Sequence, residues 1–191
     1  MGLFGVTALA AHMIAIQLPH ISYMVPMGLG QAATVLVGQA VGRRDIVTAY
    51  RVGWMVSVIA LIFMSATTVL ILIIPETLAS IFIDQSLITN VPVMELAVSF
   101  LLFAAFFQAA DGMQAVIAGA LRGLNDTFRP MLIAALSYWV FGLGLGVVIA
   151  FKTGLGAIGL WIGFVAGLSA AAILLTIRFL YLQRTHHMPS S

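Results

Sequence analysis

Charged residues are scarce in this sequence. Its 191 residues include 8 Lys or Arg and 6 Asp or Glu, whereas 62% of them are hydrophobic. A soluble domain of this length carries about 25% charged residues, or roughly 48. The chain therefore has too little polar surface for a water-soluble enzyme, a nucleic-acid-binding domain or a disordered segment. We expect an integral membrane protein.

Cysteine is absent, which excludes disulfides, thiolate metal sites and cysteine nucleophiles. The sequence also lacks a Gly-rich phosphate loop and a set of serine, histidine and acid suited to intramembrane hydrolysis. We therefore expect no enzyme activity, and the composition predicts no nucleic-acid partner. The expected partner is the lipid bilayer.

The few charges divide the chain into long apolar runs, which predict an all-α polytopic membrane bundle. A spanning helix needs about 20 apolar residues, and solid apolar runs exclude a closed barrel, whose strands alternate. The first run is either two short helices or one long helix bent at Pro19 and Pro26, and we predict the long helix. The five expected spans are roughly 7–41, 49–75, 90–122, 128–151 and 155–182.

Polar residues mark two of the expected helix starts. Thr89 and Asn90 stand just before Pro92, and proline is tolerated in a first helical turn. Asp126 and Thr127 are suited to cap the helix that contains Pro130.

The basic residues predict the orientation of the bundle. Five spans place seven arginines on one side, and Lys152 on the other together with Glu76 and Asp84. Because the side rich in Lys and Arg faces the cytoplasm, we expect an external N-terminus and a cytoplasmic C-terminus with residues 185–191 as its tail. The expected location is a plasma membrane.

Glycines recur four residues apart, which places them on one face of a helix. Such stripes let two backbones approach closely. They either pack helices tightly or provide a surface along which helices slide, and the sequence does not separate these readings. The packing glycines are Gly38, Gly42, Gly119, Gly123, Gly159, Gly163 and Gly167.

Asp111 is the one charge well inside a predicted span, with Gln108 and Gln114 three residues to either side. A carboxylate in the bilayer faces a cavity or a partner and is typical of ion and proton pathways. It can exchange a proton for a cation or for a cationic drug. The alternative is a hydrogen-bonded lock between helices. Metal binding beyond Na+ at Asp111 is not expected.

Other polar or aromatic residues are candidates for a cavity or a hydrogen-bond network, with helix packing as the alternative for each. They are His12, Gln17, Gln108 and Tyr138. His12 and His20 are eight residues apart and do not form a two-histidine metal face on one helix.

Two stretches resemble the MATE family, the multidrug and toxic compound extrusion transporters. Residues 6–45 contain a Gly-x-Gly run and a closing V-G-Q-x-x-G, and are similar to the eighth helix of NorM-like members. Residues 107–127 carry D-x-x-Q and A-G-x-L-R-G-x-x-D-T, and are similar to the tenth helix and its exit. After "AAH" the family pattern is Q-V-A-L-N, whereas Met13 and Gln17 stand here.

The resemblance implies a transporter of twelve helices in two lobes that exports cationic organic compounds in exchange for Na+ or H+, without another cofactor. Residues 1–184 would form the second, C-terminal lobe without most of its first helix. The family's coupling carboxylate falls on Asp111, and Gln114 matches its polar neighbour. The missing N-terminal lobe would come from the same gene or from a separate chain.

Two other functions remain open at this point. One alternative hypothesis is a membrane scaffold or assembly subunit that transports nothing, although a carboxylate at mid-span favours transport. The other alternative hypothesis is a flippase, from the same superfamily, that moves lipid-linked substrates. Such a site is expected to be strongly cationic, and no Lys or Arg lies deep in a predicted span.

Overall fold

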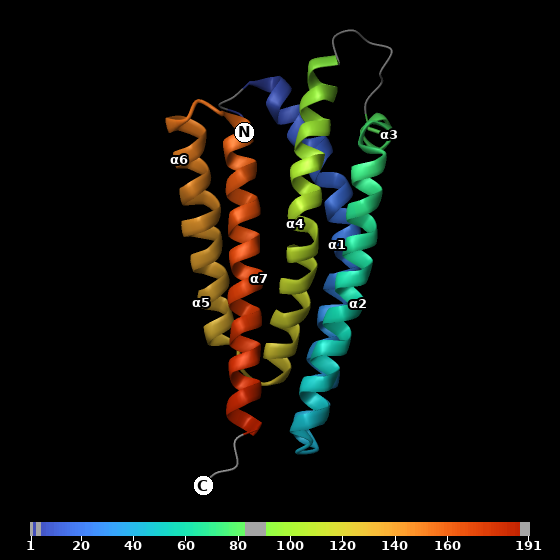
Figure 1. The fold of residues 1–191 in the computed structure, drawn as a ribbon, viewed down its shortest axis with the longest axis vertical. Helices are drawn as coiled ribbons and strands as arrows, with labels where there is room; N and C mark the ends of the chain where they lie inside the picture. Colours follow the sequence, from blue (N-terminus) through green and yellow to red (C-terminus); the bar gives the residue numbers. More distant parts are fainter. Residues whose placement is uncertain (1, 3–4, 83–90, 188–191) are drawn as a thin grey trace.

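The computed structural model of the chain describes residues 2, 5–82 and 91–187. Within these residues every regular element is helical, and the long helices run side by side (Figure 1). The elements are α1 (Val6–Gly42), α2 (Ile46–Ile73), α3 (Pro75–Ser80), α4 (Val91–Gly123), α5 (Phe128–Leu136), the π-helix η3 (Ser137–Gly144), α6 (Leu145–Lys152) and α7 (Ala157–His187).

The five predicted spans are confirmed. Five segments of the described chain are long and apolar enough to cross a membrane, and α5, η3 and α6 together form the fourth of them. The first run is one helix of 37 residues with Pro19 and Pro26 inside it, both buried. The expected start of the third span at residue 90, with Thr89 and Asn90, lies outside the described residues, as does Asp84.

Some boundaries differ from the prediction for local reasons. α2 begins three residues early because the side chain of Asp45 accepts a hydrogen bond from the Thr48 amide at 3.0 Å. Hydrogen bonding from Thr48 holds the pKa of Asp45, which lies in the turn before the span, below its ordinary value. α2 ends at Ile73, ahead of the short helix that begins at Pro75.

The last helix is longer than predicted, since α7 continues five residues past 182 to His187. Side chains of α2 hold this extension. Trp54 Nε1 donates to Gln183 Oε1 at 3.0 Å, and the Tyr50 hydroxyl lies 2.6 Å from His186 Nδ1. Residues 185–187, predicted as part of a tail, are therefore helical.

The N-cap of α5 is at Thr127 as expected, but the side-chain capping predicted for Asp126 and Thr127 is wrong. The Thr127 side chain forms no capping hydrogen bond. The Asp126 carboxylate instead pairs with Arg178 Nε of α7 at 2.7 Å. Asp126, predicted as a local cap, thus ties the turn between α4 and α5 to α7.

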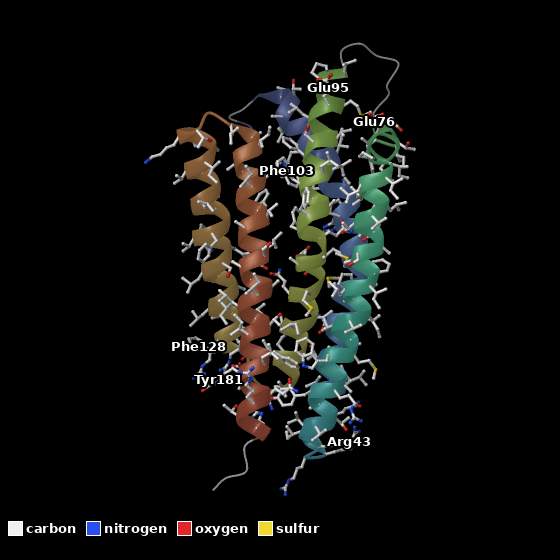
Figure 2. All side chains as sticks on the ribbon, viewed as in Figure 1. Arg43, Glu76, Glu95, Phe103, Phe128 and Tyr181 are labelled. Atoms are coloured by element: carbon white, nitrogen blue, oxygen red, sulfur yellow. The ribbon has the colours of Figure 1, made fainter. Side chains whose placement is uncertain are left out.

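α4 lies at the centre of the bundle and packs against α1, α2 and α7. Two hydrophobic clusters follow its length. We call them the arginine-rich half, which includes Tyr50 and Phe179, and the opposite half, which includes Trp161 and Phe100. Figure 2 places Arg43 at one end of the molecule, and Glu76 and Glu95 at the other.

Close backbone contacts join the helices where glycines face one another. A Cβ added to Gly119 would overlap the Gly30 carbonyl, and one at Gly123 would lie 2.8 Å from the Thr34 carbonyl oxygen. These glycines let α4 approach α1 more closely than any larger residue would allow.

Candidate functional site

Asp111 lies midway along α4, on the side of that helix that faces α1 and η3. Its carboxylate oxygen Oδ1 accepts a long hydrogen bond of 3.4 Å from Gln114 Nε2. The one ion pair found among the described residues joins Asp126 to Arg178, so no cation of the described chain pairs with Asp111. The carboxylate is therefore held weakly and is open to another partner.

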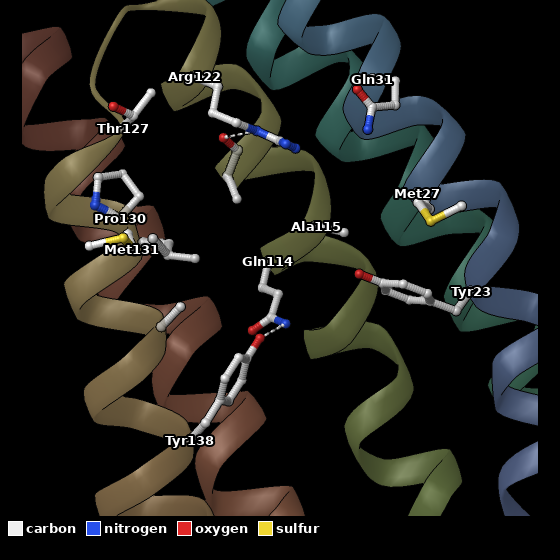
Figure 3. A pocket seen from close by; sticks show the side chains of 13 residues that line it. Tyr23, Met27, Gln31, Gln114, Ala115, Arg122, Thr127, Pro130, Met131 and Tyr138 are labelled. Carbon is white, nitrogen blue, oxygen red and sulfur yellow. Dashed lines mark hydrogen bonds between the residues drawn. The ribbon is translucent and has the colours of Figure 1, made fainter.

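Gln114 connects this carboxylate to the fourth span. The same Nε2 donates a short hydrogen bond to the Tyr138 hydroxyl, which Figure 3 shows reaching across from its neighbouring helix. Tyr138 belongs to η3, and π-helical turns are frequent at functional sites. Gln114 Oε1 is buried and has no hydrogen-bond partner in the described part of the chain.

A cavity of about 330 Å³ opens beside Asp111, and we call it the Asp111 cavity. Four helices contribute to its wall: α1, α4, η3 and α7. The lining residues are Ile16, Pro19, His20, Tyr23, Phe107, Asp111, Gln114, Tyr138 and Leu168.

A second cavity of about 330 Å³ lies toward the arginine-rich end and contains Arg122; we call it the Arg122 cavity (Figure 3). It shares Tyr23, Gln114 and Tyr138 with the Asp111 cavity, so these three side chains form a common wall. Each cavity is lined by one residue with a full formal charge at neutral pH, negative in the first and positive in the second. The two spaces therefore favour ligand groups of opposite sign.

Gln108 faces a different direction. Its Nε2 donates to Thr67 Oγ1 on α2 at 2.5 Å, and it lines neither cavity. Its Oε1 is buried and finds no partner among the described residues. The two glutamines that flank Asp111 in sequence are thus separated: Gln114 joins the site, whereas Gln108 fastens α4 to α2.

His12 and Gln17 also lie away from both cavities. The His12 ring packs edge-on to Trp161, with the ring centres 5.5 Å apart, and stacks on Phe164 at 6.4 Å. Gln17 is exposed on α1. Of the four residues expected to form a cavity or polar network, Tyr138 lines the cavities and Gln108 enters a hydrogen bond.

Sequence reasoning missed His20, Tyr23 and Arg122 as lining residues. The sequence did contain a signal for two of these residues, His20 and Tyr23. Ile16, Pro19, His20 and Tyr23 follow the spacing i, i+3, i+4, i+7, which places them on one face of α1. Arg122 was assigned to the membrane boundary by its position, but its side chain reaches the cavity beside it.

The predicted glycine stripes mostly coincide with close helix contacts. A Cβ at Gly159, Gly163 or Gly167 of α7 would overlap backbone atoms of Ala150, Gly142 or Gly146. Gly38 faces Gly123 at ordinary contact distance. A Cβ at Gly42 would meet no described atom within 4 Å, so the packing role expected for Gly42 finds no partner in the described residues.

Comparison with known proteins gives consistent matches. A family model described as MatE matches residues 1–148. The chain is 49% identical over 179 residues to a probable multidrug resistance protein NorM of Brucella suis biovar 1, and 50% identical over 180 residues to one of Mesorhizobium japonicum. These matches cover 94% of this chain but 38% of each relative, so the chain spans well under half of their length.

Solved structures agree on the fold. The crystal structure of the eukaryotic MATE transporter AtDTX14 matches with a TM-score of 0.80 at 18% identity. The inward-facing conformation of a multidrug resistance MATE family transporter gives the same TM-score at 20% identity. Both matches cover 97% of this chain and 43% of the other.

Proposed function

Since the chain belongs to the MatE family, we propose that it is the second lobe of a cation-coupled multidrug antiporter. In this proposal Asp111 exchanges Na+ or H+ for a cationic organic compound, and no other cofactor takes part. The observation that carries it is the weakly held carboxylate of Asp111 in the wall of a cavity.

The chemistry of a buried carboxylate supports exchange. In a medium of low dielectric a bare carboxylate is unstable, so it binds a proton or pairs with a cation. The Gln114 amide is the neighbour that positions it. For Na+, the oxygen ligands that a hard cation prefers are the carboxylate and Gln114 Oε1, which has no hydrogen-bond partner among the described residues. A cationic compound competes for the same oxygens, and this mutual exclusion couples the two movements.

A single lobe does not complete such a transporter. Alternating access requires two lobes that rock around a site near the middle of the membrane. The chain spans 38% of the length of its NorM relatives. The resemblance of α1 and α4 to the eighth and tenth helices supports the second lobe. We expect it to act with a first lobe, from the same or a separate chain.

We also propose that the arginine-rich end faces the cytoplasm of a bacterial cell, with the membrane being the inner one. The support for the orientation is the seven-to-one distribution of arginines and lysine between the two sides, and the support for a bacterial membrane is the set of bacterial NorM relatives. A reporter that is active only outside the cytoplasm should be active when fused after residue 153 and inactive when fused after residue 190. The reverse result would refute this orientation.

The test of coupling is Asp111→Asn in the complete transporter that carries this lobe. Asparagine keeps the size of the side chain and removes its charge. We expect normal membrane levels and at least a tenfold fall in efflux of ethidium from cells, together with loss of its dependence on the coupling ion. Glu95→Gln is the matched control, because Glu95 lies on the same helix but is exposed at its far end.

Wild-type efflux by the Asp111→Asn variant would contradict the proposal. Asp111 would then be a hydrogen-bonded lock between helices, and the coupling group would lie outside this chain. Normal membrane levels in both variants are needed for the comparison, and they are measured by immunoblot of the membrane fraction.

A further inference from the structure

Arg122 lies near the end of α4, in the wall of the cavity that adjoins the Asp111 cavity. Its Nε donates a long hydrogen bond of 3.4 Å to the Ala118 carbonyl, one turn earlier on the same helix. This contact turns the side chain back along α4, in the direction of Gln114. No carboxylate of the described residues forms an ion pair with the guanidinium. Its positive charge is therefore available to a ligand in the Arg122 cavity.

Three side chains, Tyr23, Gln114 and Tyr138, form the wall that the two cavities share. Figure 3 shows Tyr23 on α1 and Tyr138 on η3, at either side of α4. The charges of Asp111 and Arg122 both act on the Tyr23 hydroxyl, so this wall lies within the electrostatic reach of both. A ligand larger than one cavity would pass along these three side chains and meet a charge of opposite sign at each end.

Gln114 determines which end of such a ligand binds where. Its Nε2 donates to Asp111 and to Tyr138, while its Oε1 is buried and has no partner among the described residues. An amide oxygen can only accept a hydrogen bond. The Asp111 carboxylate and this oxygen thus offer acceptors to a cationic group that carries N–H donors, and Arg122 offers donors to an anionic group.

The spacing of the two charges limits the ligand further. Asp111 and Arg122 are 11 residues apart, which is about 16 Å along a helix. Because the Arg122 side chain turns back toward Ala118, the two charged groups are closer than their Cα atoms. A ligand that reaches both needs charges several ångströms apart, joined by an apolar body that packs on the tyrosine rings and on Met27 and Met131.

We propose that Arg122 is a specificity-determining residue that binds the anionic group of substrates whose cationic group binds at Asp111. The inference rests on the proposed function and names its substrate class: compounds that carry a cation and a carboxylate on one apolar body. Arginine suits this role because its planar N–H groups pair with the two oxygens of a carboxylate. A substrate with a cation alone leaves Arg122 unpaired and is repelled by its charge.

The expected size of the preference follows from the exposure of Arg122. A hydrogen bond to a charged group contributes about tenfold or more in affinity. Arg122 is exposed, so solvent and salt reduce this contribution. We therefore expect the carboxylate to improve the affinity of a matched cation by about fivefold.

The test compares two dyes that differ at one group. Rhodamine 110 carries a carboxylate at neutral pH, and rhodamine 123 is its methyl ester, so both share one cationic ring system. Their Kd values for the complete transporter in detergent micelles are measured by fluorescence anisotropy. Partition of each dye into micelles is the same for every variant, so the decisive quantity is the change in the ratio of the two Kd values.

Arg122→Gln should weaken rhodamine 110 binding about fivefold and leave the rhodamine 123 Kd within about twofold of wild type. Arg122→Lys keeps the charge and should retain part of the preference. Arg129→Gln is the matched control, because Arg129 is an exposed arginine at the same end of the bundle and lines neither cavity. It should keep the wild-type ratio.

A wild-type ratio in Arg122→Gln would overturn the inference. An equal change of the ratio in Arg129→Gln would also overturn it, because the preference would then come from the general positive charge of this end. Arg122→Met repeats the test if Arg122→Gln aggregates on size-exclusion chromatography.

Failure of the inference and failure of the proposed function are distinguishable. Both dyes carry the cation, so Asp111→Asn should weaken both by at least tenfold. If it does so while Arg122→Gln keeps the wild-type ratio, Asp111 is the cation site and Arg122 has no role in selecting substrates. If Asp111→Asn binds both dyes normally, the proposed function fails and the inference fails with it.

Discussion

At the arginine-rich half, α7 is fastened to its neighbours by polar side chains, whereas at the opposite half it is fastened by aromatic rings and glycines. The polar contacts are Arg178 with Asp126, Gln183 with Trp54, and His186 with Tyr50. In the opposite half, Trp161 stacks on Phe100 with the ring centres 5.3 Å apart and meets His12 edge-on.

The two halves differ in how strongly their contacts fix the orientation of α7 relative to the neighbouring helices. A hydrogen bond weakens steeply when its angle changes, while stacked rings and glycine contacts tolerate small displacements. Two ring nitrogens of the opposite half, Trp161 Nε1 and His12 Nδ1, are buried without a partner among the described residues. We therefore expect the arginine-rich half to be the more rigid of the two, with Asp111 lying between them.

The largest effect is expected at the glycine stripe. In Gly163→Leu the new side chain would overlap the backbone of Gly142 and Gly146 and push the fourth span away from α7. We expect folded yield in detergent to fall at least fivefold. Leu160→Ala, which removes bulk one turn earlier, is the control and should keep most of the yield. Equal yields would mean that this contact does not hold the opposite half together.

The next effect is expected at Trp161, which is 1% exposed. Trp161→Ala should lower the free energy of unfolding, measured by titration with a denaturing detergent, by about 3–5 kcal/mol. Trp139→Ala is the control, because Trp139 is 70% exposed on the fourth span, and it should change that energy by less than about 0.5 kcal/mol.

Trp161→Phe sharpens this prediction. It keeps a ring for stacking and removes the unpartnered Nε1, so it should cost much less than Trp161→Ala. A loss as large as that of alanine would show that Nε1 has a partner, such as a buried water, and that the opposite half also depends on a polar contact.

The spans themselves could be predicted because bilayer thickness sets their length and the scarce charges mark their ends. The face that each helix turns toward the bundle could not be predicted, because each span carries apolar residues all around its helix axis. Gln108 and Gln114 illustrate the point. Six residues apart, they lie about 120° apart around the helix axis, so a common site was not assured, and Gln108 faces α2 instead.

Other features depend on tertiary contacts that local sequence rules do not contain. The π-helix η3 sets the position of Tyr138, but its residues Ser137–Gly144 read as an ordinary apolar helix. His20 was assessed only for a metal face with His12, and its place opposite Asp111 required the packing of α1 on α4. Asp126 matched the pattern of a helix cap, but its carboxylate forms an ion pair with Arg178 of α7 instead.

The smallest effect is expected at the pair of Asp126 and Arg178, and it tests whether polar contacts stiffen the arginine-rich half. Their side chains are 16% and 13% exposed, and Nε lies 2.7 Å from the carboxylate. Exposed ion pairs contribute up to about 1 kcal/mol, and breaking a fully buried one costs about 3–5 kcal/mol. For Asp126→Asn we expect a loss of about 1–2 kcal/mol in the free energy of unfolding.

Arg178→Met should cost more than Asp126→Asn, because the guanidinium also lies over the Tyr181 ring at 5.5 Å. The double variant separates the two contributions: a coupling energy near 1 kcal/mol would assign the loss to the ion pair. Arg184→Gln, an exposed charge further along α7, is the control for net charge. If the coupling energy is zero, the pair does not stabilise this end, and the greater rigidity of the arginine-rich half must come from Trp54 and Tyr50 instead.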